Sequence, residues 1–98
     1  MIPMTDILYV AIVSSSDCDR RDICYVGYNK QSAERALFAC YTDLYEINQD
    51  SIDETFCPTY KTISDFIFAA TKTHNSAYIA CCDHNITFEL HECFMSER

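Results

Sequence analysis

The chain has little of what loop-rich and disordered proteins use, with one glycine, two prolines and no tryptophan in 98 residues. Small secreted domains held by disulfides are usually rich in loops, and disordered chains lack the hydrophobic residues that make up 49% of this sequence. No low-complexity segment, internal repeat or linker interrupts it. We therefore predict a single globular domain spanning residues 1–98.

Positive charge is also scarce, because seven Lys and Arg stand against fifteen Asp and Glu, for a net charge of -8. Such a charge repels phosphate backbones and anionic membrane surfaces, which argues against direct binding to nucleic acid or membranes. The apolar run at residues 7–13 is too short to span a bilayer and has no basic leading segment or cleavage site. We therefore expect a cytoplasmic protein in a reducing compartment.

Cysteine pairs and catalytic signatures are missing as well. The seven cysteines are odd in number and none stand in C-x-x-C spacing, so we expect free thiols that pack as small apolar side chains. No Walker loop, G-x-G-x-x-G, H-E-x-x-H or G-x-S-x-G motif occurs. The sequence therefore predicts a protein without catalytic residues, metal or cofactor.

What the sequence does contain is a clear order of elements. Branched and aromatic residues predict strands at 7–13 and 22–28, which pair as a hairpin. After Asn29, a helix N-cap, apolar residues recur at offsets of three and four and predict a helix over about 30–47. This stripe consists of Ala33, Ala36, Leu37, Cys40, Tyr41, Leu44 and Ile47.

The second half of the chain is expected to contain a helix followed by two strands. Residues 48–60 predict a connection, and Thr62 to Asp65 forms a capping box before a second, shorter helix. That helix is expected to end at residues 73–76, with His74 near its last carbonyls. Strands at 77–82 and 86–94 follow, around a tight turn at 83–85. The order β-β-α-α-β-β predicts an α+β fold, a four-stranded antiparallel sheet with two helices packed on one face.

The C-terminal hairpin carries three cysteines and two histidines and is the one candidate for chemistry. Zinc would need Cys81 or Cys82 together with His84, His91 and Cys93 within about 4 Å of one another. A turn at 83–85 separates Cys93 from the other two cysteines by roughly 17 to 20 Å along the strand. A Cys93 nucleophile with His91 as base would also need oxyanion donors. Both alternatives are weaker than a hairpin with ordinary alternation.

The acidic stretch at residues 36–60 contains no Lys or Arg. Its five carboxylates recur across a helix end and the following connection, beside aromatic residues. One interpretation is solubility, and the other is recognition of a basic, nucleic-acid-binding protein by carboxylates that stand where phosphates would. The predicted partner-binding residues are Asp43, Glu46, Asp50, Asp53, Glu54, Tyr45, Tyr41 and Phe38.

A compact acidic domain without catalytic motifs is similar in type to the small accessory proteins with which phages and viruses inhibit host or defence machinery. That resemblance implies a non-catalytic inhibitor that blocks a basic, nucleic-acid-handling protein. Two alternatives stay open. The protein could self-associate, for example as a homodimer, through the uncovered sheet face or an edge strand, or it could be a small thiol- or metal-dependent enzyme.

Overall fold

The computed structural model describes residues 6–16, 21–72 and 77–95. The elements follow the predicted order, and the connection after the first helix contains one short 3-10 turn. They are β1 (Asp6–Ser15), β2 (Arg21–Gly27), α1 (Lys30–Ile47), η1 (Gln49–Ser51), α2 (Ile63–Lys72), β3 (Ala77–Ala80) and β4 (Asn85–Met95).

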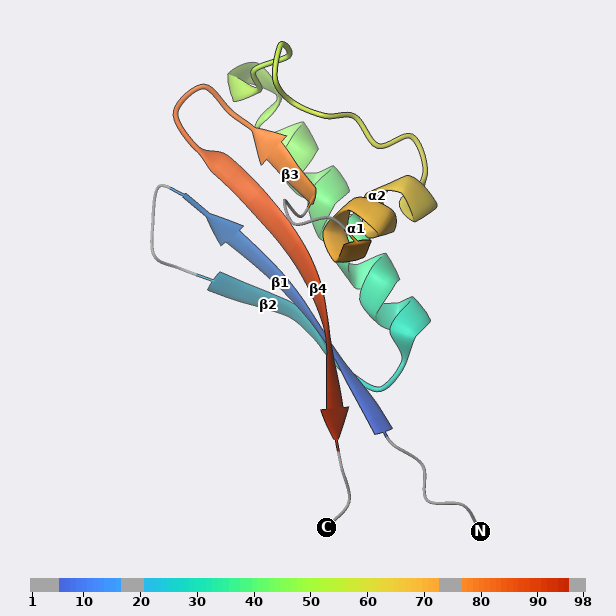
Figure 1. Ribbon diagram of the computed structural model, residues 1–98. Helices are drawn as coiled ribbons and strands as arrows, with labels where there is room; N and C mark the ends of the chain where they lie inside the picture. Colours follow the sequence, from blue (N-terminus) through green and yellow to red (C-terminus); the bar gives the residue numbers. More distant parts are fainter. Residues whose placement is uncertain (1–5, 17–20, 73–76, 96–98) are drawn as a thin grey trace, which may run out of the picture.

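The four strands form one antiparallel sheet in the order β2-β1-β4-β3. The two longest strands, β1 and β4, pair at the centre along the whole of β1 and join the two hairpins. Both helices lie on the same face of this sheet and contact each other (Figure 1). The predicted α+β class and element order are therefore confirmed.

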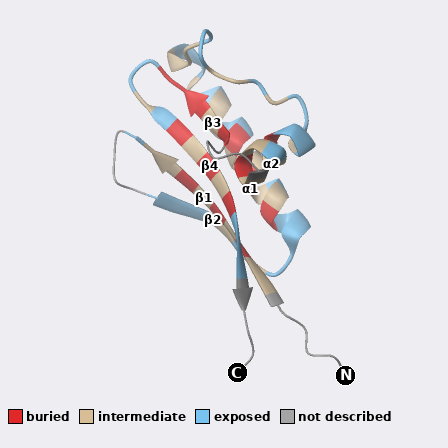
Figure 2. Ribbon diagram, in the orientation of Figure 1, coloured by how far each residue is buried: buried red, intermediate tan, exposed pale blue. Residues whose placement is uncertain are grey.

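The core lies between that face and the helices. Alternate residues of the strands are buried there, as Tyr9, Ala11 and Val13 on β1 show. Ile86, Phe88 and Leu90 do the same on β4, as the predicted alternation requires. Figure 2 shows the buried residues gathered where strands and helices face each other, whereas much of β2 is exposed. Among the residues that the structure describes, no helix covers the opposite face of the sheet.

Helix α1 begins and ends as the sequence predicts. The Asn29 side chain accepts a hydrogen bond from the Ser32 backbone N–H at 2.9 Å, the contact expected of an N-cap. Ala33, Leu37 and Tyr41 are the fully buried members of the apolar stripe. Its last member differs from the prediction, because Ile47 is 75% exposed.

Helix α2 starts at the predicted capping box, where the Thr62 hydroxyl accepts a hydrogen bond from the Asp65 N–H at 3.1 Å. Phe66 and Ala70 are buried against the sheet. The expected end of this helix at 73–76, including His74, lies outside the described residues. No helix in the described ranges is long and apolar enough to cross a membrane.

The C-terminal hairpin differs from the prediction in register. Ala80 pairs with Asn85, so the turn covers residues 81–84 rather than 83–85. Cys81 instead bridges to Ile52 in the connection after α1. The tertiary contact thus takes residues 81 and 82 out of the predicted strand, which a local sequence pattern does not reveal.

Candidate functional site

Five carboxylates cluster in sequence around the C-terminal end of α1 and the connection that follows it. Asp43, Glu46, Asp50 and Glu54 are exposed, and Asp53 is half-buried. These segments lie at the end of the molecule opposite the start of β1 and the end of β4 (Figure 1). We call residues 43–56, with their five carboxylates, the acidic end.

The charges of α1 oppose the helix dipole. The first turn contains no acidic residue and begins with Lys30, and the last turn contains no basic residue and carries Glu46. A negative charge at a helix C-terminus is unfavourable by about 0.3 to 1 kcal/mol at low ionic strength. The fold alone therefore gives no reason for an acidic residue at this position.

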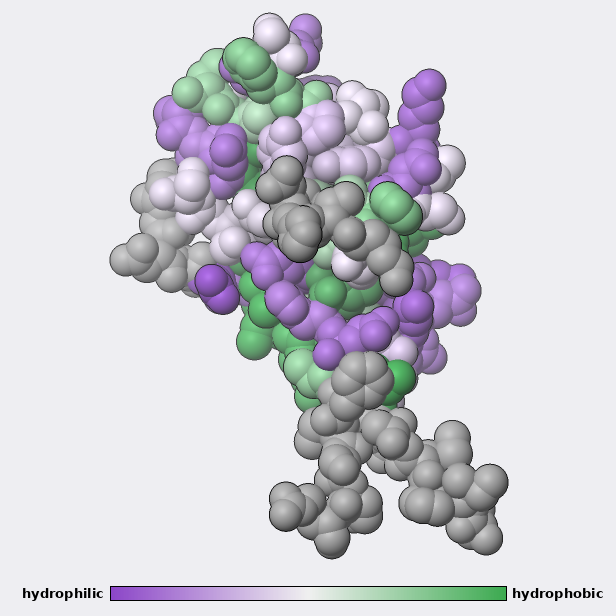
Figure 3. All heavy atoms as spheres, viewed as in Figure 1, coloured by the Kyte–Doolittle hydropathy of each residue, from purple (hydrophilic) through white to green (hydrophobic). Residues whose placement is uncertain are grey.

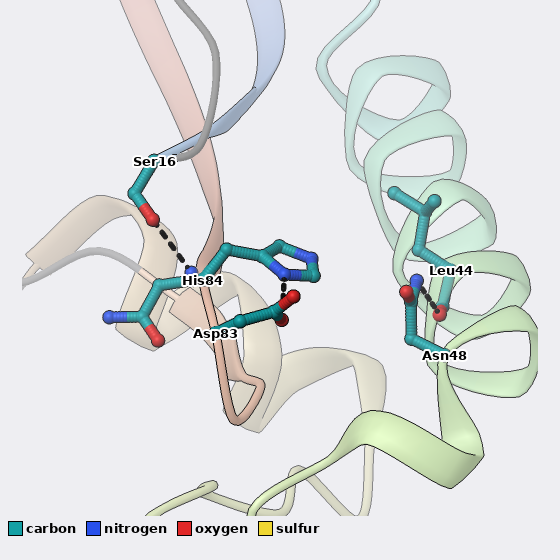
Figure 4. Close-up of polar contacts among 6 residues, drawn as sticks. Ser16, Leu44, Asn48, Asp83 and His84 are labelled. Carbon is teal, nitrogen blue, oxygen red and sulfur yellow. Dashed lines mark hydrogen bonds and ion pairs between the residues drawn. The ribbon is translucent and has the colours of Figure 1, made fainter.

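A neutral side chain caps the C-terminal end of α1. The amide of Asn48 donates to the Leu44 carbonyl at 2.8 Å, and the Asn48 backbone N–H donates to the same oxygen at 3.0 Å (Figure 4). Lysine or arginine commonly interacts with helix carbonyls here. Because Asn48 caps the helix without a positive charge, the acidic end keeps a single sign.

Backbone hydrogen bonds fasten the connection after η1 to the outer edge of β3. The Asp53 N–H donates to the Ala80 carbonyl and the Cys82 N–H donates to the Ser51 carbonyl, both at 2.8 Å. The Ala80 N–H in turn donates to the Cys57 Sγ at 3.4 Å. The carboxylates of residues 50–54 are thus carried on a segment held by the sheet.

One predicted contact residue must be corrected. Tyr41 is only 5% exposed, and its ring centroid lies 4.8 Å from that of Phe66 and 5.5 Å from that of Phe88. Burial raises the pKa of its hydroxyl to about 12. Tyr41 is a core residue and is not available to a partner. Phe38 and Tyr45 are half-buried against the same cluster.

The exposed apolar side chains at this end are different ones. Ile47 is 75% exposed at the last position of α1, and Phe56 is 70% exposed in the connection. In Figure 3 the same end of the molecule shows hydrophobic residues beside hydrophilic ones. Isolated exposed apolar residues are common, but here they stand close in sequence to carboxylates, and protein interfaces combine an apolar centre with a polar rim. The helical period had predicted Ile47 to be buried.

The hairpin turn adds a sixth carboxylate next to the acidic end. Asp83 follows Cys82, whose backbone is bonded to Ser51, and the Asp83 side chain is 82% exposed. Its Oδ1 lies 2.7 Å from the Nδ1 of His84, and this hydrogen bond lowers the pKa of Asp83 (Figure 4). This approach depends on the contact between Ser51 and Cys82, which are 31 residues apart in sequence, and no local sequence pattern indicates it.

A surface cavity of about 550 Å³ lies beside the acidic end. The turn at 53–56 forms one wall, and the β3–β4 hairpin forms the other. The Asp53 Oδ1 accepts a hydrogen bond from the Thr55 N–H at 3.1 Å, and the Tyr78 hydroxyl lies 3.5 Å from the Phe56 carbonyl. The lining residues are Asp53, Phe56, Tyr78, Ala80, Cys81, Asn85 and Thr87.

The cysteines and histidines of the hairpin do not converge. Cys93 pairs with Leu8 of β1, eight residues along β4 from the Asn85 position that faces Ala80, or roughly 26 Å at the rise of a strand. His91 instead contacts Glu89, with 2.7 Å between Nε2 and Oε1. Within the described part of the chain, no group of three or more His, Cys, Asp or Glu side chains is placed to hold a metal ion.

Comparison of the chain with protein-family models, with curated proteins and with solved structures finds no match.

Proposed function

We propose that this protein is a non-catalytic binding protein whose acidic end docks on a basic protein surface, that of a nucleic-acid-handling partner. The observation that supports the proposal is that the carboxylates lie at one end of the molecule, on the same segment as the exposed side chains of Ile47 and Phe56. Charge steers association, and desolvated apolar anchors supply most of the affinity. Blocking such a surface is how an inhibitor of phage or viral type acts on a host or defence protein in a cytoplasm.

The electrostatics of α1 support recognition over solubility alone. Carboxylates anywhere on the surface would keep a small protein soluble. Glu46 stands where the helix dipole disfavours it, and Asn48 caps the helix where a basic residue would be more favourable. A cost in stability that accompanies a one-signed surface is typical of a binding site.

The cavity beside Asp53 gives this surface a place for one basic side chain. A carboxylate next to the rings of Phe56 and Tyr78 suits a lysine or arginine, since cations pair with carboxylates and are attracted to aromatic faces. The amide of Asn85 and the hydroxyl of Thr87 offer further acceptors. We expect Asp53→Asn and Phe56→Ala each to weaken binding of the partner without unfolding the protein.

Affinity capture from the native host tests the proposal when it is done with matched variants. The first variant, Asp43→Asn/Glu46→Gln/Asp50→Asn, removes three charges from the acidic end. The second, Glu34→Gln/Glu89→Gln/Glu92→Gln, removes three charges elsewhere. We expect the wild type and the second variant to capture the same partner, and the first variant to lose it. Double-stranded DNA and high salt should both displace that partner.

Equal capture by both variants, or a stronger loss in the second, would contradict the proposal. Retention of the captured partner at high salt and in the presence of excess DNA would contradict it too, because mimicry of phosphates requires competition for the same basic groups.

Self-association through the open sheet face is the second candidate function. Ile23 and Val26 of the edge strand β2 are 63% and 54% exposed. Val10 and Ile12 of β1 pair with Val26 and Ile23, and Leu8 follows on the same face of β1; all three β1 residues are half-buried. An apolar, uncovered strand edge can pair with another chain. A dimer by analytical ultracentrifugation that Ile23→Lys converts to a monomer would favour this function.

A further inference from the structure

Two thiols meet beneath the edge strand β2. The Sγ of Cys40 on α1 lies 2.9 Å from the Sγ of Cys24 on β2, and the two residues are sixteen apart in sequence. Both side chains are half-buried, and both are free in this structure. The other described cysteines include Cys82 and Cys93, which are exposed.

A β-bulge creates this contact. Ala11 pairs with Tyr25 and Ile12 pairs with Ile23, so Cys24 is an extra residue without a partner on β1. In a regular strand Cys24 would point away from the face that Tyr25 occupies. The bulge breaks the alternation, and both Cys24 and Tyr25 pack against the core beside the helices.

We propose that Cys24 and Cys40 form a reversible disulfide that fastens the edge strand β2 to α1 when a low-molecular-weight disulfide such as oxidised glutathione is present. A disulfide has an S–S distance of about 2.05 Å, so the two sulfur atoms need to approach by less than about 1 Å. The bulge on β2 and the helix position of Cys40 already aim the thiols at each other.

The reaction balances as two successive thiol–disulfide exchanges. One protein thiol loses its proton and attacks a sulfur of oxidised glutathione, which releases one glutathione thiolate and leaves a mixed disulfide. The second protein thiol then loses its proton and attacks the protein sulfur of that mixed disulfide, which releases the second glutathione. Two electrons pass to oxidised glutathione, and two protons leave with its thiols.

The burial of Cys24 lowers the rate of this exchange at neutral pH. Removal of Cys24 from water raises the pKa of its thiol to about 12, and the neighbouring Cys40 thiol and the Asp22 carboxylate act in the same direction. Because the thiolate is the nucleophile, attack by Cys24 is slow at neutral pH and accelerates as the pH rises. Exchange that begins at Cys24 therefore needs a sustained oxidising poise, whereas the balance of reduced and oxidised protein at equilibrium is set by the ratio of reduced to oxidised glutathione.

The test uses the full chain equilibrated with defined ratios of reduced to oxidised glutathione, followed by rapid alkylation and peptide mapping by mass spectrometry. We expect a Cys24–Cys40 cross-link, mixed disulfides with glutathione at Cys82 and Cys93, and faster cross-linking at pH 9 than at pH 7. The cross-linked protein should melt about 10 °C or more above the reduced protein, since the bond closes a sixteen-residue loop.

Two variants serve as controls for this test. Cys18→Ala/Cys82→Ala/Cys93→Ala removes competing thiols and should still form the cross-link, whereas Cys40→Ser should lose both the cross-link and the rise in melting temperature. The proposal is overturned if Cys24 and Cys40 remain alkylatable at a poise that modifies Cys82 and Cys93. A cross-link from Cys24 to any other cysteine in the wild-type chain would overturn it as well.

Discussion

The two edge strands of the sheet differ in whether their outward-facing backbone N–H and C=O groups are covered. At the β3 edge, the connection after η1 adds hydrogen bonds from Asp53 and to Ser51 and covers the strand. At the β2 edge, no further strand pairs with Arg21–Gly27 within the described residues, and Ile23 and Val26 are exposed. The covered edge carries carboxylates, and the open edge carries apolar side chains and a bulge.

This difference shows how one small sheet can provide two unlike surfaces. Covering β3 holds the connection in place, so that polar residues on it can form a site. The bulge on β2 adds local twist and irregularity, which discourages uncontrolled edge pairing and aims Cys24 at α1. In our two proposals, partner recognition involves the covered edge and the redox-sensitive contact involves the open one.

Matched isoleucine substitutions test this contrast most strongly. Ile79 on β3 is fully buried and Ile23 on β2 is 63% exposed. Ile79→Ala should lower the free energy of unfolding by about 2 to 5 kcal/mol, because it leaves a cavity in the core. Ile23→Ala should change it by about 0.5 kcal/mol or less. Urea denaturation of both variants provides the measurement, and a larger loss for Ile23→Ala would show that β2 is buried against something else.

Alkaline titration compares Tyr41, which lies in the core, with Cys24, which is half-buried beneath the open edge. Tyr41 has a pKa of about 12 in the fold, against 10.0 for a free tyrosine, so the unfolded chain loses this proton first as the pH rises. Stability should then fall between pH 10 and 12, by about 2 to 3 kcal/mol in total from Tyr41. The pKa of the Cys24 thiol is raised from 9.0 to about 12, so its contribution to stability should fall as the pH rises above 9.

Denaturation experiments on Tyr41→Phe and Cys24→Ser across the alkaline range separate the contributions of these two groups to stability. Tyr41→Phe should flatten the decline above pH 10, and Cys24→Ser should delay its onset. Because Cys24 is half-buried, its effect should be the smaller of the two. A stability that stays constant from pH 9 to 12 in the wild type would show that neither group is shielded from water.

Much of the fold is encoded in local patterns, and the site is not. Asn29 and the apolar period fixed the helix at 30–47, because capping and amphipathicity are local. The turn at 81–84 escaped prediction since it depends on the contact between Ile52 and Cys81. The carboxylates were visible in sequence, but the exposure of Ile47, the burial of Tyr41 and the approach of Asp83 depend on how the connection folds back.

Removal of a single charge at the acidic end should have a small effect on folding, and the sign of that effect is informative. Glu46→Gln removes a negative charge beside the last carbonyls of α1, so we expect stability to rise by about 0.3 to 1 kcal/mol at low salt. Glu34→Gln, near the start of the same helix, should not stabilise. Thermal melts at two ionic strengths measure the difference, which salt should reduce. A destabilised Glu46→Gln would mean that its carboxylate makes a contact needed by the fold.

Binding of an arginine-rich peptide, followed by NMR and calorimetry, tests the acidic end most directly. The two charge-matched triple variants differ only in where three charges are removed. We predict that the wild type and Glu34→Gln/Glu89→Gln/Glu92→Gln bind with similar affinity and with shift changes centred on residues 43–56. Asp43→Asn/Glu46→Gln/Asp50→Asn should bind at least about tenfold more weakly. Equal weakening of both variants, or shift changes centred on β2, would contradict recognition by the acidic end.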